Sequence, residues 1–278
     1  MSLITEWVRY GADGEYRGYA ARPAHAGEPL PAVIVLQEIW GVDEHIRDVT
    51  ERFARAGYVA FAPDLFAENG EPAGALSEER IGDAKRFLNT IPPAAWRDGE
   101  KRKEALSALP ADRGSTIEET LGQLFDLGGR FPDFIHRITT ASAWLRGSFA
   151  PSRGRGVASV GFCLGGALSA ALAAKDAGLS GAVIFYGNPP AGELLSDIGC
   201  PLLGLYGELD KRITDAVPAF AAALEAAGKS FEHRIYRGAQ HAFFNDTRPS
   251  FHPDAARDAF TRTLEFLQRT LAGEAPLM

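Results

Sequence analysis

One cysteine stands in a setting that could make it a nucleophile. The run Gly161-Phe162-Cys163-Leu164-Gly165-Gly166 continues an apolar segment, 157–162, that is predicted to be a buried strand, and it leads into a predicted helix. A tight strand–turn–helix connection strains the backbone of its central residue and needs small neighbours. Cys163 would then lie at a helix N-terminus, where the helix dipole favours a thiolate. The backbone N–H of Leu164 would face the same space and could stabilise an oxyanion.

An acid and a histidine follow Cys163 in chain order. Asp210 comes shortly after a predicted strand at 202–206, and His241 comes shortly after another at 231–236. The carboxyl ends of strands in an open α/β sheet meet at the edge where ligands bind, so we expect the three side chains to converge. His241 would take the thiol proton and return one to a leaving group, while Asp210 would orient the imidazole.

Each of these residues also has an ordinary structural interpretation. Cys163 could be a buried core cysteine, Asp210 a turn or N-cap residue, and His241 a surface residue of a loop. Three candidates in this order, each at the end of a strand, are less expected by chance than any one of them. The remaining histidines are expected at the surface, and these are His25, His45, His136, His233 and His252.

A second polar segment follows the first strand that is predicted to be buried, at 32–36. In Gln37-Glu38-Ile39-Trp40-Gly41, the backbone N–H of Ile39 could be the second oxyanion donor. Glu38 is an acid directly after an apolar strand, which favours a role in the site. The alternative is a loop carboxylate that forms a salt bridge, with Arg47 as the candidate partner.

The elements that must position these residues alternate between strands and helices. Such alternation predicts parallel strands with right-handed crossovers, and hence a three-layer α/β sandwich with a mostly parallel central sheet. We expect a single domain over 1–278 with an insertion at about 66–130 that could form a cap or lid. A capping box is predicted at Thr116. The predicted strands are 3–10, 15–22, 32–36, 58–62, 157–162, 182–186, 202–206 and 231–236, and the predicted helices include 77–88, 116–127, 132–146, 164–175, 214–227 and 253–271.

Composition limits the classes of partner. The 278 residues carry a net charge of -7, which disfavours nucleic acid or an anionic membrane as a partner. Two cysteines are too few for a disulfide framework, and neither a signal peptide nor a run of eighteen apolar residues is present. We therefore expect a cytoplasmic protein that acts on a small molecule, as a monomer or small homo-oligomer. No spacing typical of a zinc site or of a phosphate-binding loop occurs, so no metal or cofactor is predicted.

Together these motifs resemble the dienelactone hydrolases (carboxymethylenebutenolidases), a family of the α/β-hydrolase superfamily. The resemblance covers about two thirds of the chain, mainly 31–66 and 137–271. It implies hydrolysis of a cyclic enol-lactone to a keto-acid, as in the degradation of aromatic compounds, with Cys163, His241 and Asp210 as a catalytic triad. The motifs are Gln37-Glu38-Ile39-Trp40-Gly41, Ala62-Pro63-Asp64-Leu65, the run around Cys163, Tyr186-Gly187, Gly207-Glu208-Leu209-Asp210 and Gly238-Ala239-Gln240-His241-Ala242-Phe243.

The resemblance also implies how the thiol is controlled. In the family, the carboxylate at the position of Glu38 meets the resting thiol, and substrate binding shifts it so that the thiolate forms only then. Tyr186 matches a tyrosine that lines the family's pocket. Trp40, Tyr186 and Asn245 are thus the candidate substrate-binding residues.

Two features depart from the family. Asn245 stands four residues after the histidine, where the family has an arginine that binds the substrate carboxylate. A neutral amide does not supply the charged, forked contact of arginine, although Arg248 or an arginine of the insertion could compensate. The segment 66–130 is also longer than usual for the family, so a different lid could select a different acid or ester.

The sequence therefore favours a hydrolase that cleaves a lactone or activated ester through an acyl-cysteine intermediate. A broader carboxylesterase or thioesterase for uncharged esters is the alternative that Asn245 supports. A non-catalytic binding protein of the same fold is a third interpretation, against which the complete set of three catalytic candidates argues. A redox role that pairs Cys163 with Cys200 is the fourth, although Cys200 is expected to lie in the core.

Overall fold

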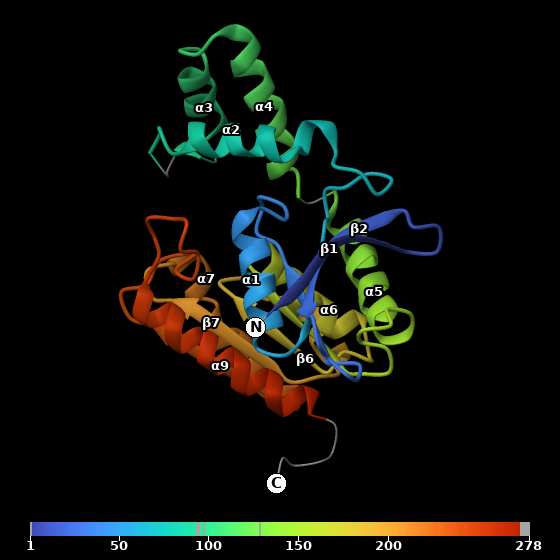
Figure 1. Ribbon diagram of the computed structural model, residues 1–278. Helices are drawn as coiled ribbons and strands as arrows, with labels where there is room; N and C mark the ends of the chain where they lie inside the picture. The colour runs from blue at the N-terminus through green and yellow to red at the C-terminus, as the bar shows by residue number, and fades with distance from the viewer. Residues whose placement is uncertain (1, 93–94, 97, 128, 273–278) are drawn as a thin grey trace.

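One eight-stranded sheet forms the centre of the computed structural model, which describes residues 2–92, 95–96, 98–127 and 129–272 (Figure 1). The strand order is β1-β2-β4-β3-β5-β6-β7-β8. The first two strands form an antiparallel hairpin, β2 pairs antiparallel with β4, and all the other pairs are parallel. The mostly parallel sheet is therefore confirmed. The strands are β1 Leu3–Tyr10, β2 Tyr16–Pro23, β3 Ala32–Leu36, β4 Val59–Pro63, β5 Val157–Phe162, β6 Gly181–Phe185, β7 Leu202–Gly207 and β8 Phe231–Tyr236.

Helices cover both faces of this sheet, because successive residues of a strand point to opposite faces and both sets are apolar. In β3, Val33 and Val35 join the core beneath α1 and α9, while Ile34 and Leu36 join the core beneath α5 and α6. The three-layer α/β sandwich is thus confirmed, and Figure 1 shows α1 and α9 along the near face. The helices of these layers are α1 Glu44–Arg55, α5 Phe131–Gly147, α6 Leu164–Lys175, α7 Lys211–Thr214, α8 Val217–Ala226 and α9 Pro253–Leu271, with a short 3-10 helix at Gly192–Asp197.

The insertion forms a helical cluster of its own beyond the sheet (Figure 1). It consists of a 3-10 turn at Gly74–Leu76 and of α2 Glu78–Leu88, α3 Gly99–Leu106 and α4 Ala111–Phe125. Apolar side chains of these helices, such as Phe87 and Leu121, are buried against one another. These side chains belong to the same buried apolar cluster as the core beneath α5 and α6, and the role of the insertion as a lid stays a prediction.

The sequence prediction was wrong about some helix boundaries. The capping box at Thr116 does not exist, because α4 begins at Ala111 and the Thr116 hydroxyl instead donates to the backbone oxygen of Asp112 at 2.9 Å. The helix predicted at 214–227 is α8, which begins only at Val217 after the separate short helix α7 has ended at Thr214, and Pro218 lies in the first turn of α8, where its missing N–H costs nothing. In the described part of the chain, no helix is long and apolar enough to cross a membrane.

Candidate active site

Cys163 occupies a strained turn between β5 and α6. Its backbone has φ 56° and ψ -110°, a conformation that is costly for a residue with a Cβ and that needs support from its surroundings. Its N–H donates to the Phe185 carbonyl oxygen at 3.0 Å, and the N–H of Gly165 donates to the Gln37 oxygen at 3.0 Å. A methyl group at Gly161 would collide with the carbonyl oxygen of Gly165, so this close approach requires glycine. The sequence context expected of a nucleophile is present in the structure.

Asp210 and His241 meet at the carboxyl edge of the sheet. The His241 Nδ1 atom lies 2.5 Å from Asp210 Oδ2, and because a carboxylate only accepts, Nδ1–H is the donor. Asp210 precedes α7, yet its side chain makes no capping hydrogen bond, which excludes the capping alternative. Burial lowers the pKa of His241, but the charge of Cys163 and the hydrogen bonds that His241 makes with Asp210 and Cys163 outweigh it and raise this pKa to about 10. The imidazole is therefore held between Asp210 and Cys163.

Glu38 is buried and is bound by two donors. The Asn245 amide Nδ2 donates to Glu38 Oε2 at 3.0 Å, and the Tyr186 hydroxyl donates to Oε1 at 3.4 Å. The alternative pairing with Arg47 is wrong, since that guanidinium binds Glu78 at 2.9 Å. Among the hydrogen bonds of the described residues, none joins Glu38 to the Cys163 thiol, the contact that the resemblance implies.

Two backbone amides are candidates for binding an oxyanion. Leu164 is the first residue of α6, so its N–H has no partner within the helix. Ile39 lies two residues beyond Gln37, whose carbonyl oxygen accepts the N–H of Gly165. This hydrogen bond ties the loop after β3 to the turn at Cys163 and so brings the two candidate amides into the same region.

The three candidate substrate-binding residues are all buried. Trp40 is 3 % exposed, Tyr186 1 % and Asn245 0 %. The Tyr186 ring lies edge-on to the imidazole of His241, with 5.1 Å between ring centroids, so it forms a wall of the site. Asn245 is turned towards Glu38, and a side chain bound in this way has little freedom to contact a substrate.

A tryptophan of the insertion, which sequence reasoning missed, reaches the body of the protein. The Trp96 ring is 6.4 Å from the Trp40 ring, and the Arg248 guanidinium lies 5.4 Å from the Trp96 centroid. The Trp96 indole N–H donates to the Leu88 carbonyl oxygen at 3.0 Å, which fixes its orientation. A lone tryptophan in a largely hydrophilic segment was the available signal. Trp96 thus connects the insertion with Trp40 in the loop after β3 and with Arg248 in the loop after His241.

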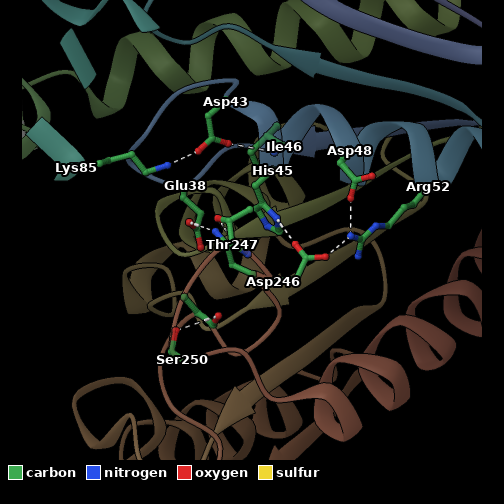
Figure 2. Close-up of polar contacts among 12 residues, drawn as sticks. Glu38, Asp43, His45, Ile46, Asp48, Arg52, Lys85, Asp246, Thr247 and Ser250 are labelled. Carbon is green, nitrogen blue, oxygen red and sulfur yellow. Dashed lines mark hydrogen bonds and ion pairs between the residues drawn. The ribbon is translucent and has the colours of Figure 1, made fainter. Parts of the chain in front are cut away.

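A cavity of about 420 Å³ lies between the insertion and the body. Trp40, Lys85 and Thr247 are among its lining residues, whereas Cys163 and His241 are not. Lys85 donates to Asp43 at 2.7 Å across this space, as Figure 2 shows. Trp40 is therefore the candidate site residue that this cavity includes.

His45 is an exception among the histidines expected at the surface. It is 2 % exposed, and its Nδ1 atom lies 3.6 Å from Asp246 Oδ1. Asp246 also accepts from Arg52 Nη2 at 2.5 Å, and Figure 2 shows this carboxylate between His45 and Arg52. Partial burial raises the pKa of Asp246, but Arg52 outweighs it and lowers this pKa. The loop after His241 is therefore anchored to α1.

Comparisons with known proteins agree with this architecture. The model of the "Dienelactone hydrolase family" matches residues 16–271. A Saccharolobus solfataricus protein named "Putative carboxymethylenebutenolidase" is 34% identical over 270 residues, covering 94% of this chain and 97% of that one. An Escherichia coli O157:H7 protein of the same name is 33% identical over 262 residues, covering 90% of this chain and 81% of that one.

A solved structure is similar over almost the whole chain. The crystal structure titled "Putative Dienelactone Hydrolase" from Klebsiella pneumoniae has a TM-score of 0.72 and 29% sequence identity, and the match covers 97% of this chain and 100% of that chain. The matched span includes the turn at Cys163 and the strand ends that carry Asp210 and His241. The chain belongs to the dienelactone hydrolase family.

Proposed function

We propose that this protein hydrolyses a lactone that carries a carboxylate, through an acyl-cysteine intermediate. Membership of the family makes it a hydrolase of esters or lactones. The finer assignment is supported chiefly by one observation, which is the strained Cys163 beside an imidazole that Asp210 binds at 2.5 Å. A nucleophile, a base and a group that orients the base are the parts that covalent acyl transfer needs.

The reaction then follows from this arrangement. The proton of the Cys163 thiol passes to His241, the sulfur attacks the lactone carbonyl carbon, and the amides of Ile39 and Leu164 hold the oxyanion. The ring C–O bond breaks, and the departing enol oxygen takes a proton from His241. Water next loses a proton to His241 and attacks the thioester carbon, which releases the acid and restores the Cys163–His241 pair. Asp210 orients and stabilises the imidazolium throughout.

Arg248 is the candidate partner of the substrate carboxylate. Arg248 lies against Trp96. Burial raises the pKa of the Tyr186 phenol, and the charge of Arg248 has a weaker effect in the opposite direction. Arg248 is therefore close enough to influence this wall of the site. Among the ion pairs of the described residues, none involves Arg248. A half-buried guanidinium without a carboxylate partner suits recognition of an anion by a charged hydrogen bond. This favours an anionic substrate over the uncharged ester of the alternative.

Steady-state hydrolysis tests the function directly. We expect turnover of a dienelactone carboxylate, and rapid quenching followed by mass spectrometry should find the acyl group on Cys163. If only a simple aryl ester is hydrolysed, the carboxylesterase alternative would be favoured for the substrate, and the acyl-cysteine mechanism would still stand. Absence of turnover for both substrates would contradict the proposal and favour a non-catalytic binding protein.

The substitution Arg248→Gln tests the substrate class. We expect kcat/KM for the carboxylate lactone to fall roughly ten- to hundredfold, the usual value of a hydrogen bond to a charged group, while its methyl ester changes little. Kinetics with the two substrates in parallel measure the difference, and Arg257→Gln, on the exposed surface of α9, is the matched control. An equal loss for both substrates would show that Arg248 supports the fold or the insertion rather than binding an anion.

A further inference from the structure

Trp96 belongs to the insertion, yet its ring meets two loops that carry candidate residues of the site. The centroid of the ring is 6.4 Å from that of Trp40, in the loop after β3, and the two rings are nearly perpendicular at 78°. The Arg248 guanidinium, in the loop after His241, lies over the Trp96 ring at 5.4 Å from its centroid. Trp96 is therefore a part of the insertion that is placed to act on the site.

Two hydrogen bonds fix Trp96 within the insertion. Its indole N–H donates to the Leu88 carbonyl oxygen, at the end of α2, at 3.0 Å. Its own carbonyl oxygen accepts from Arg102 Nη1, in α3, at 2.6 Å. The ring is therefore presented to the two loops by the insertion as a whole, and not by a side chain that rotates freely.

The contact with Trp96 is what gives the Arg248 side chain its direction. Among the hydrogen bonds of the described residues, Arg248 takes part only through its backbone, which pairs with Asn245 and Phe251. A long side chain loses conformational freedom when it binds a ligand, and this loss weakens binding unless the side chain is already ordered. The aromatic ring thus orders Arg248 before a ligand arrives.

A guanidinium that lies over a ring can still bind an anion. The ring attracts the cation through the face of the guanidinium, whereas the five N–H donors lie in the plane of the group and point outward from its edges. A carboxylate binds at such an edge through two parallel hydrogen bonds. Trp96 and a substrate carboxylate therefore use different parts of Arg248 and do not compete for it.

We propose that Trp96 is a positioning residue that determines specificity, because its ring holds the Arg248 guanidinium in the direction in which it binds the carboxylate of the substrate. This inference rests on the proposed function, in which Arg248 binds that carboxylate. It assigns the preference for anionic over uncharged lactones to the insertion together with the loop after His241. The chemical step itself is left to the triad.

The substitution Trp96→Leu tests the proposal, since leucine keeps an apolar side chain and removes the aromatic face. We expect KM for the carboxylate lactone to rise roughly three- to thirtyfold, as for the loss of a contact between a cation and an aromatic ring, with kcat changed less than about twofold. The methyl ester of the same lactone should keep its KM. Steady-state kinetics with both substrates measure the difference, and circular dichroism checks the fold.

The conservative substitution Trp96→Phe should recover most of this loss. Phenylalanine keeps an aromatic face and lacks the indole N–H that binds the Leu88 oxygen, so it separates the ring from the hydrogen bond. A small rise of KM should remain, because phenylalanine attracts cations less strongly than tryptophan does. If Trp96→Leu does not fold, this smaller rise, confined to the carboxylate lactone, serves in its place.

A double-mutant cycle shows whether Trp96 acts through Arg248. In a chain that already carries Arg248→Gln, Trp96→Leu should cause no further loss for the carboxylate lactone. Trp7→Leu is the matched control, because Trp7 lies on the edge strand β1 and has the Arg17 guanidinium 4.2 Å from its ring centroid. It removes a contact of the same kind, and we expect it to leave KM unchanged for both substrates.

Binding of furan-2-carboxylate measures the same interaction without hydrolysis. This planar acid has no ester bond to cleave, and furan-2-carboxamide is its uncharged counterpart. In isothermal titration calorimetry, Trp96→Leu should weaken binding of the acid roughly three- to thirtyfold and leave that of the amide unchanged. If the wild type hydrolyses neither lactone nor ester, the proposed function fails, and this titration still decides the role of Trp96.

Three results would overturn the inference. An equal rise of KM for the lactone and its methyl ester would make Trp96 a general support of the insertion. An unchanged preference in Trp96→Leu, with loss of that preference in Arg248→Gln, would remove the role of Trp96 and leave the proposed function intact. Binding of furan-2-carboxylate that is equal in Trp96→Leu and the wild type, or absent from both, would likewise contradict the positioning role.

Discussion

Replacing Cys163 with alanine is expected to abolish nearly all lactone hydrolysis, with kcat lower by roughly 10⁴- to 10⁶-fold, as for removal of a nucleophile elsewhere. Alanine keeps the Cβ that the φ of 56° already accommodates, so the turn should survive while the sulfur that attacks is lost. Steady-state kinetics at saturating substrate measure the effect, with circular dichroism and the melting temperature as checks on folding.

Cys200→Ala is the matched control for this substitution. Cys200 is 7 % exposed, and burial together with Asp176 raises its pKa to about 12, so it remains a neutral thiol. We expect this variant to keep its activity and to lose only modest stability. A Cys163→Ala variant with wild-type turnover would refute the acyl-cysteine mechanism, whatever the activity of Cys200→Ala.

Replacing Asp210 with asparagine is the second large change that we expect. The amide would fill the same space, yet it does not stabilise an imidazolium as the carboxylate 2.5 Å from His241 does. We expect kcat at pH 7 to fall roughly 10³- to 10⁴-fold, because the imidazolium that receives the thiol proton loses the carboxylate that stabilises it. The exposed Asp215→Asn, in the same segment, is the control.

The direction of the pH dependence follows from the raised pKa of His241. In the wild type the imidazolium persists below about pH 10, so activity should decline only as the pH rises through that value. Burial lowers the pKa of His241, and without Asp210 this effect is less strongly opposed. The decline of activity on the alkaline side should therefore move to lower pH. The profile of kcat/KM against pH measures this shift, and an unmoved alkaline limb would argue against Asp210 as the partner of His241.

Much of the sheet could be predicted from the sequence, because its strands are buried on both faces and appear as uninterrupted apolar runs. The bounds of β5 and β8 agree with the prediction to the residue, and so do those of α6 and α9. The helices of the insertion were harder to predict. Its helix α3 has the sequence GEKRKEAL, with only Leu106 buried, and so presents no apolar periodicity to recognise.

The candidate site likewise has a part that could be predicted from the sequence and a part that could not. The meeting of Asp210 and His241 was predictable, since both follow strands whose ends lie at one edge of a parallel sheet. The pairing of Glu38 with Asn245 was not, because 207 residues separate them and an amide beside a carboxylate leaves no sequence pattern. The burial of His45 against Phe162 and Phe244 likewise depends on distant segments.

The two edge strands of the sheet also bear on how copies of this protein could assemble. An exposed edge invites another chain to add a strand, and charged side chains oppose this. β1 places Glu6 and Arg9 at one edge, and β8 places Glu232 and Arg234 at the other, all largely exposed. These charges oppose strand addition at both ends, so a homo-oligomer that merged two sheets would have to pair or bury them.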